Sequence, residues 1–129
     1  MMKALRLGLA STLALAVLSV APAAFASHGG GHETSGSCSG TSDWKLKLSP
    51  EDGRIEVEFE VDQNVVGDTW GVRMRDNGVM FFKGQATTEA PSGSFEVRVL
   101  ADNQPGTDKI QAQAKNLSTG EICSGTGSI

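Results

Sequence analysis

The chain has 129 residues, with 11 Lys and Arg against 15 Asp and Glu, so its formal net charge at pH 7 is −4. This length has room for one domain. An acidic chain whose basic residues are dispersed along the sequence is a poor candidate for binding nucleic acid or an anionic membrane. We therefore expect no nucleic-acid partner and no membrane insertion of the mature chain.

Residues 1–26 have the order of a secretory signal peptide. Lys3 and Arg6 precede an apolar run over residues 7–20, and a small-x-small sequence ends at Ala26. The apolar run is too short to predict a membrane-spanning helix. We expect cleavage after Ala26 and a secreted, extracellular protein. Loss of the two cations would make its net charge more negative.

Residues 27–42, SHGGGHETSGSCSGTS, are nearly all Gly, Ser, Thr and His. Such a segment buries too little apolar area to offset the entropy lost on ordering, so we predict that it is flexible. The folded domain is predicted over residues 43–129.

From Asp43 onward, apolar and polar residues alternate with a period of two, which is typical of half-buried strands. Asn77-Gly78 is the strongest hairpin signal, because both central residues of a type I′ turn need positive φ. Trp44 and Trp70 fall on inward positions and are predicted core residues. The alternation predicts seven strands, over residues 43–49, 54–61, 69–76, 79–84, 94–100, 109–116 and 121–129.

Seven short strands without a helical segment favour an all-β antiparallel sandwich. Their order and lengths resemble an immunoglobulin-like or fibronectin-type-III-like module, and the stretch PGTDKIQAQAKNLSTGEIC resembles the last hairpin of such modules. The chain has no tyrosine and therefore lacks their tyrosine corner. The stretches DWKLKLSPEDGRIEVEFEVD, APSGSF and GTDKI are also similar to small secreted bacterial single-domain sandwich proteins of unknown function. That resemblance implies secretion and an immunoglobulin-like sandwich, and it implies no activity.

Two cysteines, Cys38 and Cys123, lie near the two ends of the mature chain. In an oxidising compartment they permit one intramolecular disulfide. On the loop-entropy model such a disulfide stabilises the fold by roughly 4 kcal/mol. Metal binding by two distant thiols without a local histidine is the weaker alternative.

The stretch RIEVEFEV, residues 54–61, places Glu56, Glu58 and Glu60 on one face of a strand, with neighbours about 7 Å apart. That separation suits an inverting glycosidase pair, but a flat outer sheet face supplies neither a cleft nor a carboxyl of raised pKa. In an immunoglobulin-like topology this strand lies between the first and fifth predicted strands. The carboxylates would then form a charge ladder with lysines and arginines of those strands. A calcium site is the weaker alternative, because no Asp- and Asn-rich turn overlaps the stripe.

The hairpin at Asn77-Gly78 carries the candidate partner-binding face. A two-residue turn would pair Met74 with Phe81 inside the sandwich, Arg75 with Met80 outside, and Arg73 with Phe82 outside. Arginine stems beside exposed Met and Phe have the composition of an interface. The alternative is that these edge side chains fold over the rim of the core. The candidate face consists of Arg73, Arg75, Met80 and Phe82.

The only two histidines, His28 and His32, lie in the segment predicted to be flexible. Cleavage after Ala26 would place Ser27-His28 at the N-terminus, where an amine, an amide and an imidazole could bind copper weakly. A linker role is favoured, because no histidine of the folded domain could complete the site. Without such a histidine or a G-x-S-x-G elbow we predict no catalytic residue, no cofactor and no enzyme.

The sequence therefore predicts a secreted, non-catalytic binding or structural module, monomeric or weakly dimeric. Its partner would be an extracellular protein or a cell-surface ligand. One alternative is an inhibitor or partner of a secreted enzyme, acting through residues 87–93 or the hairpin. The other is a weak copper binder that uses His28 and His32.

Overall fold

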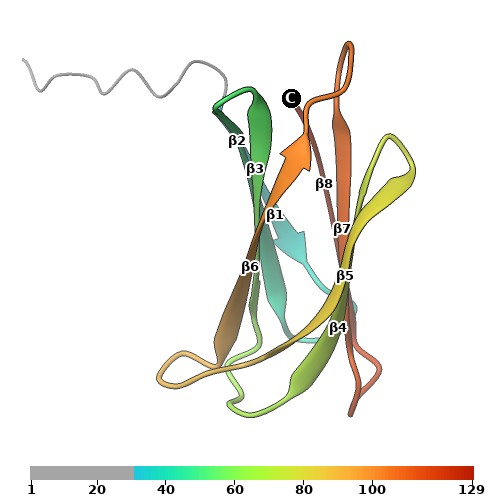
Figure 1. Ribbon diagram of the computed structural model, residues 1–129. Helices are drawn as coiled ribbons and strands as arrows, with labels where there is room; N and C mark the ends of the chain where they lie inside the picture. Colours follow the sequence, from blue (N-terminus) through green and yellow to red (C-terminus); the bar gives the residue numbers. More distant parts are fainter. Residues whose placement is uncertain (1–30) are drawn as a thin grey trace, which may run out of the picture.

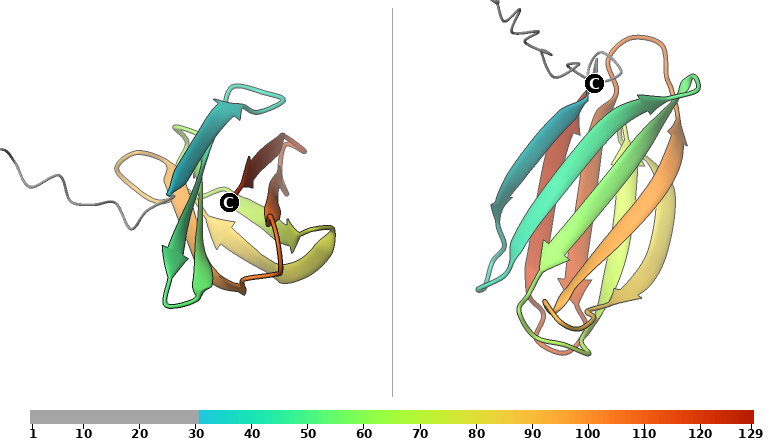
Figure 2. Two further views of the ribbon diagram at one scale, coloured as in Figure 1. Left: turned by 90° about the horizontal axis from the view of Figure 1, so that it is seen from above. Right: turned by 90° about the vertical axis from the view of Figure 1, so that its left-hand side faces the viewer.

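The computed structural model describes residues 31–129, which form two antiparallel sheets packed face to face (Figure 1). One sheet has the strand order β1-β2-β3-β6 and the other β5-β4-β7-β8. The view from above in Figure 2 shows the two layers. The eight strands are β1 (His32–Ser37), β2 (Asp43–Glu51), β3 (Arg54–Asp62), β4 (Thr69–Asp76), β5 (Val79–Thr87), β6 (Ser94–Asp102), β7 (Lys109–Asn116) and β8 (Ile122–Ser128).

The all-β sandwich and the single disulfide are confirmed, but the predicted count of seven strands was wrong by one. The additional strand is β1, which lies within the segment predicted to be flexible. It pairs with β2 along its whole length, from His32 opposite Leu48 to Ser37 opposite Asp43. Backbone pairing requires no apolar side chain, so an edge strand such as HETSGS, which has none, leaves no apolar alternation in the sequence.

The predicted signal peptide and His28 lie outside the described residues. Within residues 31–129, no helix is long and apolar enough to cross a membrane.

The core lies between the sheets and consists of the alternating inward residues. Trp70 and Phe59 are its two largest fully buried side chains among the described residues. Trp44 is partly buried and packs against the core at the edge formed by β1 and β8. Its indole lies where a Cβ on Gly36 or Gly125 would approach to 2.9 Å or 2.8 Å, so the two glycines leave space for the ring. The core prediction is therefore confirmed for Trp70, and Trp44 packs at the rim.

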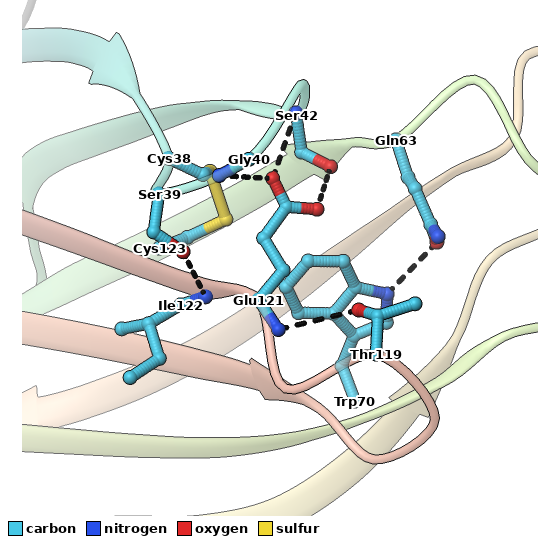
Figure 3. Close-up of a disulfide and its surroundings, with 10 residues drawn as sticks. All are labelled: Cys38, Ser39, Gly40, Ser42, Gln63, Trp70, Thr119, Glu121, Ile122 and Cys123. Atoms are coloured by element: carbon cyan, nitrogen blue, oxygen red, sulfur yellow. Dashed lines mark hydrogen bonds between the residues drawn. A yellow bond between two sulfur atoms is a disulfide. The ribbon is translucent and has the colours of Figure 1, made fainter.

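The β1/β8 side of the sandwich is held together by covalent and hydrogen bonds (Figure 3). The disulfide joins Cys38, after β1, to Cys123 in β8 across 85 residues of sequence. Glu121 accepts hydrogen bonds from the backbone N–H groups of Gly40 and Ser42, each at 2.9 Å. It also accepts one from the Ser42 hydroxyl at 2.7 Å. The loop between β1 and β2 is thereby fixed to the turn before β8.

A second polar network lies at the same end of the sandwich. Asp68 accepts hydrogen bonds from the amide of Gln63 at 2.6 Å and from that of Asn116 at 2.9 Å. These two bonds, with that from Asn116 the stronger influence, hold the pKa of Asp68 below its ordinary value. The side-chain oxygen Oε1 of Gln63 accepts the indole N–H of Trp70 at 3.0 Å. The network therefore satisfies the polar groups around the largest buried side chain.

The β4–β5 hairpin has the predicted turn but a different register beyond it. Asn77 and Gly78 have φ of 48° and 84°, and Arg75 pairs with Met80 as expected. The register then shifts by one residue between Met74 and Arg75, so that Met74 pairs with Phe82. The predicted pairing of Arg73 with Phe82 was wrong, because an irregularity of this kind adds one residue to one strand and reverses the side on which later residues lie.

Candidate functional site

The glutamate stripe on β3 lies in a charge ladder, in the strand order that the sequence predicted. β3 lies between β2 and β6, and Glu58 is opposite Lys47 on one side and Arg98 on the other. Arg98 Nη2 lies 2.7 Å from Glu58 Oε1, and other nitrogen–oxygen distances from Arg98 are 3.7 Å to Glu56 and 3.6 Å to Glu96. One arginine therefore contacts two of the three carboxylates of the stripe, and its single charge offsets one of them.

Glu58 is the most enclosed of these carboxylates, with a side chain 16% exposed. Burial raises the pKa of Glu58, Glu56 beside it acts in the same direction, and Arg98 lowers it. The stripe lies on an outer sheet face, and a hollow of about 450 Å³ beside Trp44 and Lys45 reaches it at Glu60. Across residues 31–129, no group of three or more His, Cys, Asp and Glu side chains is placed to hold a metal ion.

The structure divides the four residues of the candidate partner-binding face. Arg73 and Arg75 lie on the outer face of β4, and Met80 lies opposite Arg75 and is 42% exposed. Phe82 pairs with the buried Met74 and packs against the core. Three of the four therefore share the outer face, and the fourth belongs to the rim of the core.

His32 is an exposed residue at the start of β1. The loop after β5, residues 88–93, is held by its backbone: the carbonyl of Gly93 accepts the N–H groups of Gln63 and Asn64, each at 3.1 Å. Residues 87–93, which are the last residue of β5 and this loop, were the other candidate contact with a secreted enzyme, and their Gly93 end is fixed to the β3–β4 loop.

The outer face of the sheet β5-β4-β7-β8 carries a basic surface that the sequence did not reveal. Lys83 on β5 lies opposite Arg73 on β4, and Arg75 follows two residues further along β4. Lys109 and Lys115 lie at the two ends of β7 and alternate with its buried residues. We call these five side chains the basic face: Arg73, Arg75, Lys83, Lys109 and Lys115.

The basic face lies on the sheet β5-β4-β7-β8, and the outward positions of its four strands hold no Asp or Glu. None of its five cations takes part in an ion pair with another part of the described chain, since every pair found there lies on the opposite sheet. The outward side chains of that opposite sheet include four basic residues, Lys45, Lys47, Arg54 and Arg98, and nine acidic ones, Glu33, Asp43, Glu51, Glu56, Glu58, Glu60, Asp62, Glu96 and Asp102.

A shallow hollow of about 620 Å³ lies within the basic face. Gly71 lines it because the absence of a side chain lowers the surface between Gln85 and Lys115, its neighbours on the flanking strands. Leu117 and Ile122, 56% and 38% exposed, supply apolar area at one end. The hollow therefore combines cations, amides and a small apolar surface.

Sequence reasoning missed this face because its cations come from three strands that are separated along the chain. The alternation did place each of them outward, but only the order β5-β4-β7-β8 brings them together. The sequence did indicate two members of the basic face, because Arg73 and Arg75 already belonged to the candidate partner-binding face.

Comparison with known protein families, with curated proteins and with solved structures finds no match to this chain.

Proposed function

We propose that this chain is an exported, non-catalytic binding module that holds a linear anionic polysaccharide on the basic face. The observation that carries the proposal is a sheet surface with five cations, no carboxylate at its outward positions, and no ion pair to the rest of the described chain. The chain has an excess of acidic residues, so a surface that carries only positive charges differs from the rest of the molecule and favours an anionic partner.

The arrangement of these cations costs stability when no anion is bound. Arg73 and Lys83 are directly opposite each other on neighbouring strands, where like charges are destabilising. Arg75 adds a third cation at about 7 Å along β4. A bound carboxylate or sulfate would remove this repulsion and accept charge-assisted hydrogen bonds from the arginine guanidinium groups.

The shape and the other side chains favour a sugar polymer. Lys109 and Lys115 lie six residues apart on β7, so the basic face is about 20 Å long. Gln85, Gln111 and Gln113 lie between the cations on the same face, and their amides can both donate to and accept from hydroxyl groups. A long, shallow surface with alternating cations and amides suits a chain of hydroxylated, anionic units.

Location and fold identity form part of the same proposal. The predicted signal peptide would bring the domain to the polysaccharides outside the cell, and the disulfide suits an oxidising compartment. The sheet order supports an immunoglobulin-like, fibronectin-type-III-like sandwich, in which β2-β3-β6 form one sheet and β5-β4-β7-β8 the other. β1 is then an addition beside the first strand of that arrangement.

The proposal is tested by isothermal titration of the mature protein with polygalacturonate, dextran sulfate and neutral dextran. We expect binding of the two anionic polymers and none of dextran. Because hydrogen bonds to charged groups contribute about 1.5–3 kcal/mol each, R73E/K83E should weaken binding at least about tenfold. The control K45E/K47E makes the same change in net charge on the opposite sheet and should leave the affinity within about threefold.

Raising the ionic strength from about 0.1 M to about 1 M shortens the Debye length from about 10 Å to about 3 Å and should abolish binding. Equal losses of affinity in the two double variants would mean that the net charge of the protein determines binding, and would refute binding at the basic face. Tighter binding of single-stranded DNA than of either anionic polysaccharide would assign the face to nucleic acid instead.

A further inference from the structure

A buried carboxylate without a partner lies at the end of the sandwich formed by the β4–β5 turn and the β6–β7 loop. Asp76, the last residue of β4, is 6% exposed. Within the described chain, no N–H or hydroxyl donor reaches either of its carboxylate oxygens. Leaving a buried charge unpaired is costly, and almost all buried polar groups in proteins are hydrogen-bonded. This exception requires an explanation in terms of a ligand or a proton.

A second acidic side chain, Asp108, lies beside Asp76 and is 1% exposed. One oxygen of Asp108 accepts the backbone N–H of Gln104 at 3.0 Å. Burial first, then a side-chain hydrogen bond with Asp108, in which the two carboxyl groups share a proton, and last the negative charge of Asp108 raise the pKa of Asp76 to about 7. Above neutral pH the two carboxyl groups therefore carry buried negative charge that a bound cation would neutralise.

The charged groups around this end do not supply that charge. Asp102, at the end of β6, adds a third carboxylate at the rim, and Arg54 lies 3.9 Å from it. Lys109 follows Asp108 directly, but it alternates with the buried Ile110 and belongs to the basic face. Asp76 is thus enclosed, and among the described residues it shares a proton with Asp108 but receives no N–H or hydroxyl donor.

A hollow of about 560 Å³ opens beside Asp76 between the edge strands β5 and β6. Four of its eight lining residues are apolar, and Asn77, Asp102 and Gln104 are polar residues beside Asp76. The hollow therefore combines apolar wall with the carboxylate of Asp76 on its lining. The apolar wall residues are Val79, Phe81, Ala101 and Pro105.

We propose that this hollow binds an aliphatic chain with a terminal primary ammonium group, of the kind found on a lysine side chain, and that the ammonium is held by Asp76. The apolar walls would cover the methylene stem, as long cationic side chains commonly pack on apolar surface. An ammonium has three N–H donors. The two oxygens of Asp76 and the side-chain oxygen of Gln104 can accept them.

An ammonium fits this place better than a metal ion. Calcium takes six to eight oxygen ligands, several of them carboxylates. Among residues 31–129, no three acidic, histidine or cysteine side chains converge on one point in that way. A hollow of this size with apolar walls is also far larger than a single ion requires.

The position at two sheet edges favours a lysine within an extended peptide. β5 and β6 are the outermost strands on this side and expose backbone groups that can pair with an added strand. Val79 lines the hollow and is 71% exposed, and Leu100, next to the lining residue Ala101, is 47% exposed on the outer face of β6, so both edges offer apolar contacts. This inference does not depend on the basic face, which lies on the outer surface of one sheet.

The test is titration of the ¹⁵N-labelled mature protein at pH 8 with Nα-acetyl-lysine methylamide, n-pentylammonium and CaCl₂, in a buffer without amines. We expect both amines to shift the backbone amide signals of Val79, Ala101 and Gln104. Asp76→Asn should weaken binding at least about tenfold. Asp62→Asn, which removes a charge at the exposed end of β3, should leave it unchanged, as should R73E/K83E.

Val79→Ser tests the apolar wall at a residue that is already exposed. The substitution should weaken the binding of n-pentylammonium more than the binding of ammonium ion. Binding should be roughly an order of magnitude weaker at pH 5.5 than at pH 8, because a protonated Asp76 offers no charge. If n-pentylammonium binds and Nα-acetyl-lysine methylamide does not, the site exists but binds free amines instead of a peptide. No amine binding in the wild type, binding that survives Asp76→Asn, or an Asp76-dependent response to CaCl₂ alone would each overturn the proposal.

Discussion

Replacing Asp76 with asparagine is expected to stabilise the protein at pH 8, although the substitution lies in a buried position. The pKa of Asp76 is raised to about 7 in the folded state, whereas an unfolded aspartate has a pKa of about 3.9. Between these values the folded state retains a proton that the unfolded state has released. The stability contributed by this proton is therefore present below about pH 4 and is lost as the pH rises to about 7.

The size of the effect follows from the shift. One pKa unit corresponds to about 1.4 kcal/mol, so three units set an upper limit of about 4 kcal/mol. Water in the adjoining hollow screens the charge, and we therefore expect Asp76→Asn to raise the free energy of unfolding at pH 8 by about 2–4 kcal/mol. In a domain of this size that corresponds to an increase in Tm of roughly 10–25 °C.

The assay is urea denaturation of wild type, Asp76→Asn and Asp62→Asn at pH 4, 6 and 8, in buffers without amines. The difference between wild type and Asp76→Asn should be small at pH 4 and grow as the pH rises. Asp62→Asn should stay within about 0.5 kcal/mol of wild type throughout, as surface substitutions usually do. A difference that does not vary with pH, or a variant less stable than wild type at pH 8, would refute the account of Asp76.

Two other substitutions test the packing and the charge ladder. Gly125→Ala should cost about 1–3 kcal/mol in thermal or urea denaturation, because its Cβ would lie 2.8 Å from the Trp44 ring and 3.2 Å from the Phe59 ring. Gly71→Ala is the control, since its Cβ would meet only Leu117 at 3.8 Å, and equal costs would contradict the argument. Glu58→Gln should change the free energy of unfolding at pH 7 by less than about 1 kcal/mol, because burial and Glu56 offset the attraction of Arg98. A loss above about 2 kcal/mol would show that this ion pair matters more than its surroundings indicate.

Much of the sandwich could be predicted from local pattern. In RIEVEFEV the period of two identifies both the buried row, Ile55 to Val61, and the charged row beside Lys47 and Arg98. Asn77-Gly78 fixes its turn because its backbone needs positive φ at both residues. The two cysteines allowed one pairing, and the structure contains it.

What could not be predicted depends on positions that are distant in the sequence. β1 has no apolar alternation, and it is ordered by pairing with β2 and by the disulfide after it. The shift at Met74 inverts Phe82, and no residue type in VMFFKG requires it. Asp76 and Asp108 meet because the end of β4 pairs with the start of β7, and neither residue differs locally from an ordinary turn aspartate.

The opposite signs of the two outer faces polarise the molecule across its thickness. Near a charged surface the protein would rotate before contact, so the basic face would approach a polyanion first. Copies that arrive in this way leave their glutamate stripes pointing outward. A polymer coated with this protein would therefore keep its negative sign toward the surroundings, and neighbouring coated chains would continue to repel one another.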